Sequence, residues 1–141
     1  GLDVVLAAAE SMARTFNFEV PARMRAMVAE GRLGRKSGRG FYTYKAGKAV
    51  RVRGAKYTGD RQVLENRLIL RLINEVVACL HEKVVEDTDL IDAGIVFGTG
   101  FAPFRGGPLH YLETGDRATL RDELLQLEHR YGKRFTADQG W

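Results

Sequence analysis

The sequence contains little cysteine and proline, with one Cys and three Pro in 141 residues. One cysteine excludes an intrachain disulfide and a metal site built from several thiolates. Cys79 lies in the apolar run LINEVVACL without flanking cations, so we expect a small apolar side chain rather than a nucleophile. No apolar run approaches the roughly 20 residues of a membrane span, and no charged-then-apolar leader opens the sequence. These absences predict a globular protein without a membrane span in a reducing, cytoplasmic compartment.

Charge is present but unevenly distributed. Residues 1–57 contain 12 Lys or Arg and 4 Asp or Glu, whereas residues 58–141 contain 10 and 14, so a net charge of +4 divides into +8 and −4. The stretch from Gly31 to Gly59 holds nine cations and no acid. Such a stretch predicts an anionic ligand or a complementary acidic surface, which the second half of the chain itself could supply.

The apolar periodicity predicts a mainly α-helical protein with one small β-hairpin. Helices are expected over residues 2–16, 21–30, 61–84, 89–97, 109–113 and 117–131, and the hairpin over residues 41–45 and 49–53. Asp3, Asp60, Thr88 and Asp116 are the expected N-caps. The helix over 61–84 carries apolar residues around more than one face, which predicts a central and largely buried element.

The stretch GRLGRKSGRGFYTY, residues 31–44, combines glycines with cations and then aromatics. It is not a P-loop, because Arg35 rather than glycine precedes Lys36 and Ser37. The second glycine stretch, GTGFAP, has Pro103 where a dinucleotide loop needs its third glycine. An RNA-recognition signature would place a glycine or alanine where Tyr42 stands, so we expect no specific nucleic-acid binding.

For the remaining polar residues, the sequence favours structural roles over catalytic or metal-binding ones. The three histidines, at 81, 110 and 129, lie far apart without metal-ligand spacing, so we expect no metal site. The acids clustered between Glu82 and Asp92 are expected to face water near a helix break. Glu75 interrupts the apolar pattern of the long helix, which predicts a buried structural carboxylate that accepts from backbone amides of a glycine loop.

Three stretches carry a resemblance to a known family. GRLGRKSGRGFYTY resembles the end of a C-terminal repeat of the 3-hydroxyacyl-CoA dehydrogenases, as in the alpha subunit of the multifunctional fatty-acid oxidation complex. ENRLILRLINEVVACLHE and IDAGIVFGTGFAPFRGGPLHYLE resemble the opening of the next repeat. The resemblance implies helical repeats like the C-terminal domain of 6-phosphogluconate dehydrogenase. Residues 1–57 would be the remainder of the first repeat, with the hairpin and the glycine-rich basic stretch within residues 31–44, which we call the basic loop. Residues 58–141 would be the second repeat.

The same resemblance implies a function for the longer parent protein. The parent would oxidise 3-hydroxyacyl-CoA with NAD in fatty-acid β-oxidation and carry enoyl-CoA hydratase activity elsewhere. The NAD loop and the catalytic histidine and glutamate find no match here, so we expect an excised fragment that is inactive alone and binds no NAD. Asn66 matches a family asparagine near the catalytic centre, although in the family that role belongs to the first repeat.

The implied task of this portion is to shape the substrate cleft and to form subunit contacts. Expected partners are the upstream NAD-binding and hydratase domains, the acyl-CoA substrate, a thiolase beta subunit and a second copy in a homodimer. The glycines of the basic loop are interpreted as tight turns, while Arg35, Lys36 and Ser37 are candidates for contact with the phosphates of CoA. The alternative hypothesis is a stand-alone basic module that binds CoA-like or other polyanions.

Overall fold

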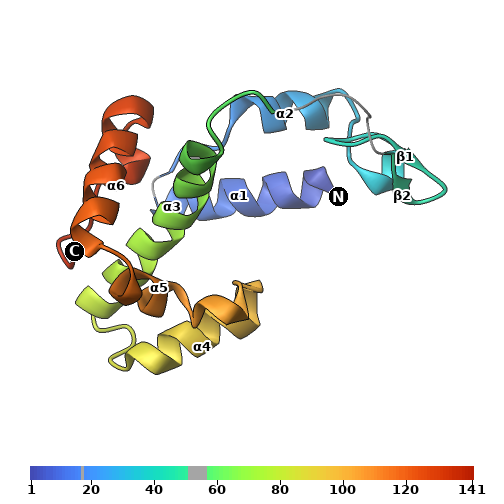
Figure 1. Cartoon of the computed structure of the whole chain (residues 1–141). Coiled ribbons are helices and arrows are strands. Elements are labelled where there is room, and N and C mark those ends of the chain that lie inside the picture. The colour runs from blue at the N-terminus through green and yellow to red at the C-terminus, as the bar shows by residue number, and fades with distance from the viewer. Residues whose placement is uncertain (17, 51–56) are drawn as a thin grey trace. The chain divides into compact units, whose positions relative to one another are not determined.

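The computed structural model describes residues 1–16, 18–50 and 57–141. These residues form two compact units, Gly1–Tyr57 and Thr58–Trp141, which are described separately. Helices dominate and the described strands form a single small antiparallel pair, which confirms the predicted fold class (Figure 1). The assignment of the two units to successive repeats of one family stays a prediction.

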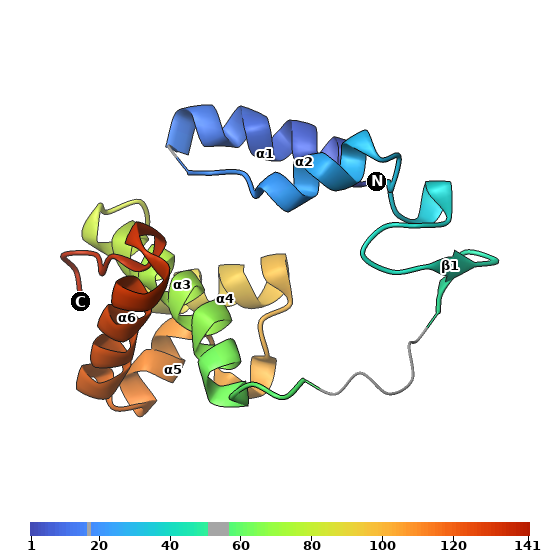
Figure 2. The same ribbon diagram turned by 90° about the horizontal axis from the view of Figure 1, so that it is seen from above.

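The first unit is built on two helices that pack against each other, α1 (Leu2–Phe16) and α2 (Ala22–Ala29) (Figure 2). Pro21 precedes α2 with φ −56°, the value its ring imposes and a helix start accepts. The chain then passes through a short 3₁₀ helix, η1 (Arg35–Ser37), into the hairpin. This helix pair therefore leads directly into the basic loop.

The hairpin consists of β1 (Tyr44–Lys45) and β2 (Lys48–Ala49), with Tyr44 opposite Ala49. Its two-residue turn places Ala46 at φ 47° and Gly47 at φ 73°. Two left-handed residues in succession form the turn that matches the natural twist of two strands. The strands are shorter than predicted, and residues 51–53 of the expected second strand lie outside the described part of the chain.

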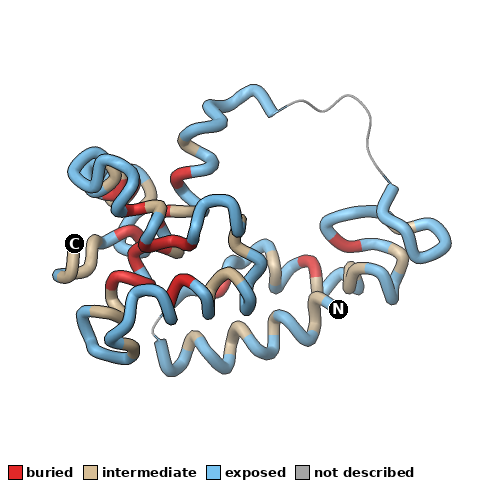
Figure 3. Tube along the Cα trace, turned by 60° about the horizontal axis from the view of Figure 1, so that its bottom comes forward, coloured by how far each residue is buried: buried red, intermediate tan, exposed pale blue. Residues whose placement is uncertain are grey.

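The second unit is organised around α3 (Arg61–His81), which contacts α5 (Pro108–Thr114), α6 (Arg117–Tyr131) and the 3₁₀ helix η3 (Lys133–Phe135). The remaining long helix, α4 (Thr88–Thr99), contacts α5. A short 3₁₀ helix, η2 (Pro103–Arg105), joins these two helices. Figure 3 marks the buried residues in red. The core consists of Leu70, Ile73, Val76, Val77, Ile91, Leu109, Leu112, Leu124, Leu127 and Phe135.

The helix ends agree with the predicted caps in part. Asp60 and Asp116 accept hydrogen bonds from Gln62 N and Ala118 N, as expected. The cap of α4 is Asp87 rather than Thr88, because the Asp87 carboxylate accepts from Leu90 N at 3.0 Å.

The long helix differs from the prediction in length and burial. It ends at His81 rather than residue 84, and Lys83 takes the left-handed φ of 56° that stops a helix. One face is buried instead of several, since Leu68 is 67% exposed. Among the described residues, no helix combines the length and apolar character that crossing a membrane requires.

Candidate functional site

The basic loop of the first unit is closed by its own backbone. Gly34 N donates to Arg39 O at 2.8 Å, and Gly34 and Gly38 take φ values of 96° and 70°, which favour glycine. A Cβ on Gly40 would lie 2.7 Å from the Cα of Gly34. The glycines therefore let the chain turn and approach itself, and they present η1 at the edge of the loop.

Ser37, one of the predicted phosphate contacts, is engaged inside the loop. Its Oγ accepts from Leu33 N at 2.8 Å and lies 2.9 Å from the carbonyl oxygen of Arg39, to which it can donate. With its hydroxyl proton and one lone pair used in this way, the side chain holds the turn together. Ser37 thus supports the neighbouring cations.

Lys36, the second predicted contact, forms an ion pair with Asp3 at the start of α1. The Nζ of Lys36 lies 2.5 Å from Asp3 Oδ2, and this hydrogen bond lowers the pKa of Asp3. Leu2 N also donates to Leu33 O at 3.0 Å. Both contacts tie the loop to α1, so the charge of Lys36 is partly neutralised within the unit.

Arg35 and Arg39 are the cations that the loop presents to solvent. Both are exposed, and their side chains have no hydrogen-bond or ion-pair partner among the described residues. Arg32, by contrast, donates to Gly40 O at 3.1 Å and pairs with Glu30. Arg35 is a predicted phosphate contact, whereas Arg39 is not among the predicted residues. Its spacing of four residues from Arg35 in an acid-free stretch is the signal that could have found it.

Asn66, in the second unit, is a buried connection between two helices. Its Oδ1 accepts from Gln62 Nε2 at 2.8 Å, and its Nδ2 donates to Glu123 Oε2 at 2.6 Å. The amide therefore joins α3 to α6. The matching family role of Asn66 near a catalytic centre stays a prediction.

The expectation that Glu75 is buried is wrong. Its side chain is 64% exposed and pairs with Arg71, one turn earlier on α3, at 2.7 Å. The adjacent residue Asn74 occupies the buried position, because the apolar face of α3 includes Ile73 and Val77. The helix thus points Glu75 away from the core.

The buried carboxylate belongs to Asp92, and the expectation that this residue faces water is also wrong. Asp92 accepts from Leu109 N at 2.8 Å and from His110 N at 2.9 Å, and so caps the start of α5. Gly107 allows this approach, since a Cβ there would lie 2.2 Å from the Asp92 Cγ. In the stretch GTGFAPFRGGP, which leads from the end of α4 into α5, only Gly107 and Pro108 are buried, and Phe104 is 85% exposed. The backbone amides that were expected to pair with Glu75 pair with Asp92 instead.

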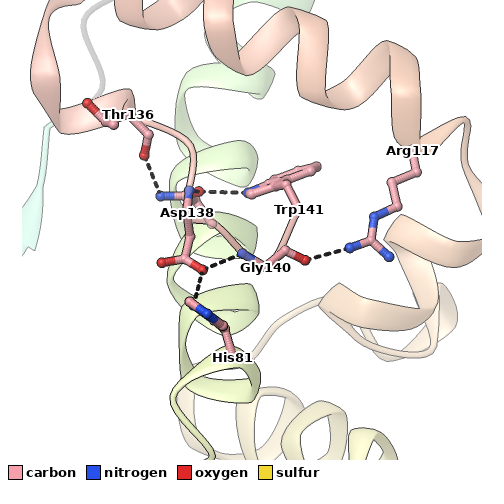
Figure 4. Close-up of polar contacts among 7 residues, drawn as sticks. His81, Arg117, Thr136, Asp138, Gly140 and Trp141 are labelled. Atoms are coloured by element: carbon pink, nitrogen blue, oxygen red, sulfur yellow. Dashed lines mark hydrogen bonds and ion pairs between the residues drawn. The ribbon is translucent and has the colours of Figure 1, made fainter.

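A polar cluster holds residues 136–141 against α3 (Figure 4). Asn74 Nδ2 donates to Thr136 O at 3.0 Å, and Asn74 Oδ1 accepts from Asp138 N at 2.9 Å and Trp141 Nε1 at 2.7 Å. His81 Nδ1 lies 3.0 Å from Asp138 Oδ1. We call residues 136–141 the C-terminal tail. No sequence motif marks Asn74 as its anchor.

The described glycine stretches do not fit NAD. Gly100 ends α4 in a left-handed conformation, so GTG forms the carbonyl end of a helix rather than opening an N-terminus. The basic loop leads into a 3₁₀ helix of three residues. Within the part of the chain that the structure describes, no three His, Cys, Asp or Glu side chains gather as a metal site. Burial raises the pKa of the Cys79 thiol, which disfavours the nucleophilic thiolate.

Comparison with known proteins agrees with the resemblance seen in the sequence. Residues 1–44 match the sequence model described as "3-hydroxyacyl-CoA dehydrogenase, C-terminal domain". The chain is 37% identical over 128 residues to "Fatty acid oxidation complex subunit alpha" of Shewanella halifaxensis (strain HAW-EB4), covering 84% of the chain. It is 36% identical over 132 residues, or 87% of the chain, to the protein of the same name from Vibrio vulnificus (strain CMCP6).

The chain spans a small part of these relatives, 18% of the first and 19% of the second. The matches nonetheless cover both units described above, because they extend over most of the chain. Residues 1–44 are thus similar to the C-terminal domain of 3-hydroxyacyl-CoA dehydrogenases, and over most of its length the chain is similar to fatty acid oxidation complex alpha subunits.

Proposed function

We propose that this chain is the C-terminal portion of a fatty-acid β-oxidation enzyme that oxidises 3-hydroxyacyl-CoA with NAD, and that it contributes shape rather than chemistry. The observation that carries the proposal is the match of residues 1–44 to the dehydrogenase C-terminal domain. The glycine stretches do not fit the cofactor, so NAD and the acid–base pair would be held by other parts of the parent. This portion would complete the substrate cleft and contact neighbouring domains.

Within that role, the basic loop would face the phosphates of acyl-CoA. Arg35 and Arg39 offer guanidinium groups whose donors are not used by the described residues. A guanidinium can bind a phosphate through two parallel hydrogen bonds. Lys36 and Ser37 would act indirectly, because the ion pair with Asp3 and the bonds of the Ser37 hydroxyl keep η1 in place. This division of roles refines the three-residue contact expected from the sequence.

Titration of the full 141-residue chain with coenzyme A at about 50 mM and about 200 mM salt tests the loop. We expect weak binding that declines with salt and is reduced by Arg35→Gln and Arg39→Gln. Lys45→Gln removes the same charge from the exposed strand β1 and is the matched control. Dephospho-CoA, which lacks one phosphate, should bind more weakly than CoA. Equal affinities for the two loop variants and the control would contradict a phosphate contact at the loop.

The alternative, a stand-alone module for polyanions, is favoured by the nine cations between Gly31 and Gly59. The same titration separates the two functions. A module evolved for this task should bind CoA at micromolar concentration without other domains, whereas a portion of a larger cleft should bind at about millimolar concentration or more weakly. The upstream domains, a thiolase beta subunit and a second copy are the partners we propose for the parent protein.

A further inference from the structure

The second unit contains a cavity of about 280 Å³ to which the proposed function assigns no role. Its apolar floor comes from α3 and α5 and consists of Val77, Leu80, Leu109 and Leu112. Its polar rim consists of His81, Thr88, Glu113, Arg117 and the backbone of Gly140. The volume lies just below the range of drug-sized ligand sites, which suits a smaller molecule.

The C-terminal tail lines the cavity at Gly140, and several contacts hold the tail in place. Asn74 binds the tail at three points, and Arg117 Nη2 donates to Gly140 O at 2.8 Å. A Cβ on Gly140 would lie 2.9 Å from the Cβ of His81 and 3.0 Å from a methyl carbon of Val77. Glycine therefore brings the tail close to α3. In Figure 4, His81 and Arg117 reach the tail from different helices.

The rim carries two opposite charges that do not pair with each other. Glu113, near the end of α5, has no hydrogen-bond or ion-pair partner among the described residues. The hydrogen bond from Arg117, at the start of α6, to the Gly140 carbonyl uses one of the five N–H donors of the guanidinium. The Nδ1 of His81 contacts the Asp138 carboxylate at 3.0 Å. Within the described part of the chain, a carboxylate without a partner and a guanidinium with unused donors thus lie beside an aliphatic floor.

We propose that this cavity binds a small zwitterion with an aliphatic body, of the class of the aliphatic α-amino acids. Arg117 would bind the ligand carboxylate through its remaining donors, and Glu113 would bind the ammonium group. The aliphatic side chain would lie on the floor formed by Val77, Leu80, Leu109 and Leu112, where its burial is favourable. The proposal does not depend on the dehydrogenase assignment, because it uses only residues of the second unit.

The charges of Glu113 and Arg117 favour a zwitterion over ligands that carry one charge or none. A plain carboxylate would meet Arg117 but face the unpaired charge of Glu113, and a plain amine would meet the reverse. An uncharged aliphatic molecule would leave both charges without a partner. A ligand that carries both charges satisfies both side chains, and a cavity of about 280 Å³ limits its aliphatic body to a few carbons.

The test is titration of the 15N-labelled 141-residue chain with L-leucine, followed by amide NMR shifts. The comparison ligands are leucinamide, which lacks the carboxylate, and N-acetyl-leucine, which lacks the ammonium group. We expect L-leucine to bind with a dissociation constant of about 1 mM and to shift the amides of Val77, Leu112 and Gly140. Each comparison ligand should bind about fivefold more weakly.

Two variants assign the charges. Glu113→Gln should weaken the binding of L-leucine about fivefold, so that L-leucine no longer binds more tightly than N-acetyl-leucine. Arg117→Gln should weaken the binding of L-leucine about fivefold and abolish its advantage over leucinamide. Glu65→Gln on α3 and Arg121→Gln on α6 change the same charges at exposed positions outside the cavity and should leave binding unchanged. Equal binding of the three ligands, unchanged binding by Glu113→Gln, or no shifts with L-leucine would overturn the proposal.

Discussion

Trp141 Nε1 donates a hydrogen bond of 2.7 Å to Oδ1 of Asn74, a residue 67 positions earlier in the chain. The same oxygen accepts from Asp138 N, while the amide nitrogen of Asn74 donates to Thr136 O. One side chain of α3 thus satisfies two donors and one acceptor of the C-terminal tail. The tail in turn lines the cavity at Gly140.

Asn74→Ala should lower the free energy of unfolding by about 2 kcal/mol, because it leaves the buried polar groups of the tail without partners. Urea denaturation followed by the fluorescence of Trp141, the one tryptophan of the chain, measures this change. Glu75→Gln changes the adjacent exposed residue and should shift the free energy by less than about 0.5 kcal/mol. Equal denaturation midpoints for the two variants would show that Asn74 does not anchor the tail.

Two glycines of the second unit should respond oppositely to alanine. Gly107 has φ 137°, and a Cβ there would meet the Asp92 carboxylate at 2.2 Å. Gly107→Ala should therefore destabilise the unit by about 2 kcal/mol or more. Gly94 lies within α4, and apart from the adjoining backbone of this helix no described atom lies within 4 Å of the point that a Cβ there would occupy. Gly94→Ala should therefore stabilise the unit by about 0.5–1 kcal/mol.

Thermal or urea unfolding of both alanine variants checks these signs. Circular dichroism of each folded variant serves as the control for helix content. A stabilised Gly107→Ala variant would contradict the close approach of Gly107 to Asp92. A destabilised Gly94→Ala variant would show that something outside the described contacts packs on this side of α4.

The helices were largely predictable from the sequence, because their starts and periodicity are local properties. Asp60, Asp116 and Pro21 stand where the helices begin. The burial of particular polar residues was not predictable in the same way. Glu75 and Asn74 are neighbours, and a rotation of about 100° per residue decides which of them enters the core. Because apolar residues lie on several faces of α3, the sequence does not show which face of the helix is turned toward the core.

The candidate site was predictable only in its location. Glycines and cations in residues 31–44 indicate a tight basic loop, and the structure contains one. Which cations are free depends on Asp3, which is distant in sequence but pairs with Lys36. The cavity was not predictable either, since its floor and rim come from α3, α4, α5, α6 and the tail. Such residues meet only after tertiary packing.

Acid should destabilise the second unit partly through Asp116. The hydrogen bond from the Thr119 hydroxyl, followed by those from the backbone amides of Thr119 and Ala118, lowers the pKa of Asp116 below its ordinary 3.8. Because the folded-state pKa is the lower one, this group stabilises the fold above the unfolded pKa. That contribution is lost as the pH falls through the folded-state value.

Unfolding midpoints between about pH 5 and pH 2 test this linkage. Asp116→Asn keeps a good N-cap but removes the titrating charge, so stability should depend less on pH at the acidic end. Asp122→Asn removes the same charge from α6 outside the cap, and the stability of this variant should depend on pH as that of the wild type does. A steeper acid dependence in Asp116→Asn would contradict the lowered pKa.

We propose above that this chain supplies shape to a dehydrogenase whose chemistry resides elsewhere in the parent protein. NADH formation from 3-hydroxyacyl-CoA and NAD measures it most directly, with the 141-residue chain and the longer parent polypeptide assayed at equal molar concentration. We expect sustained turnover by the parent and no NADH above the protein-free rate for the chain. Sustained turnover by the chain alone, or none by a folded parent, would contradict it.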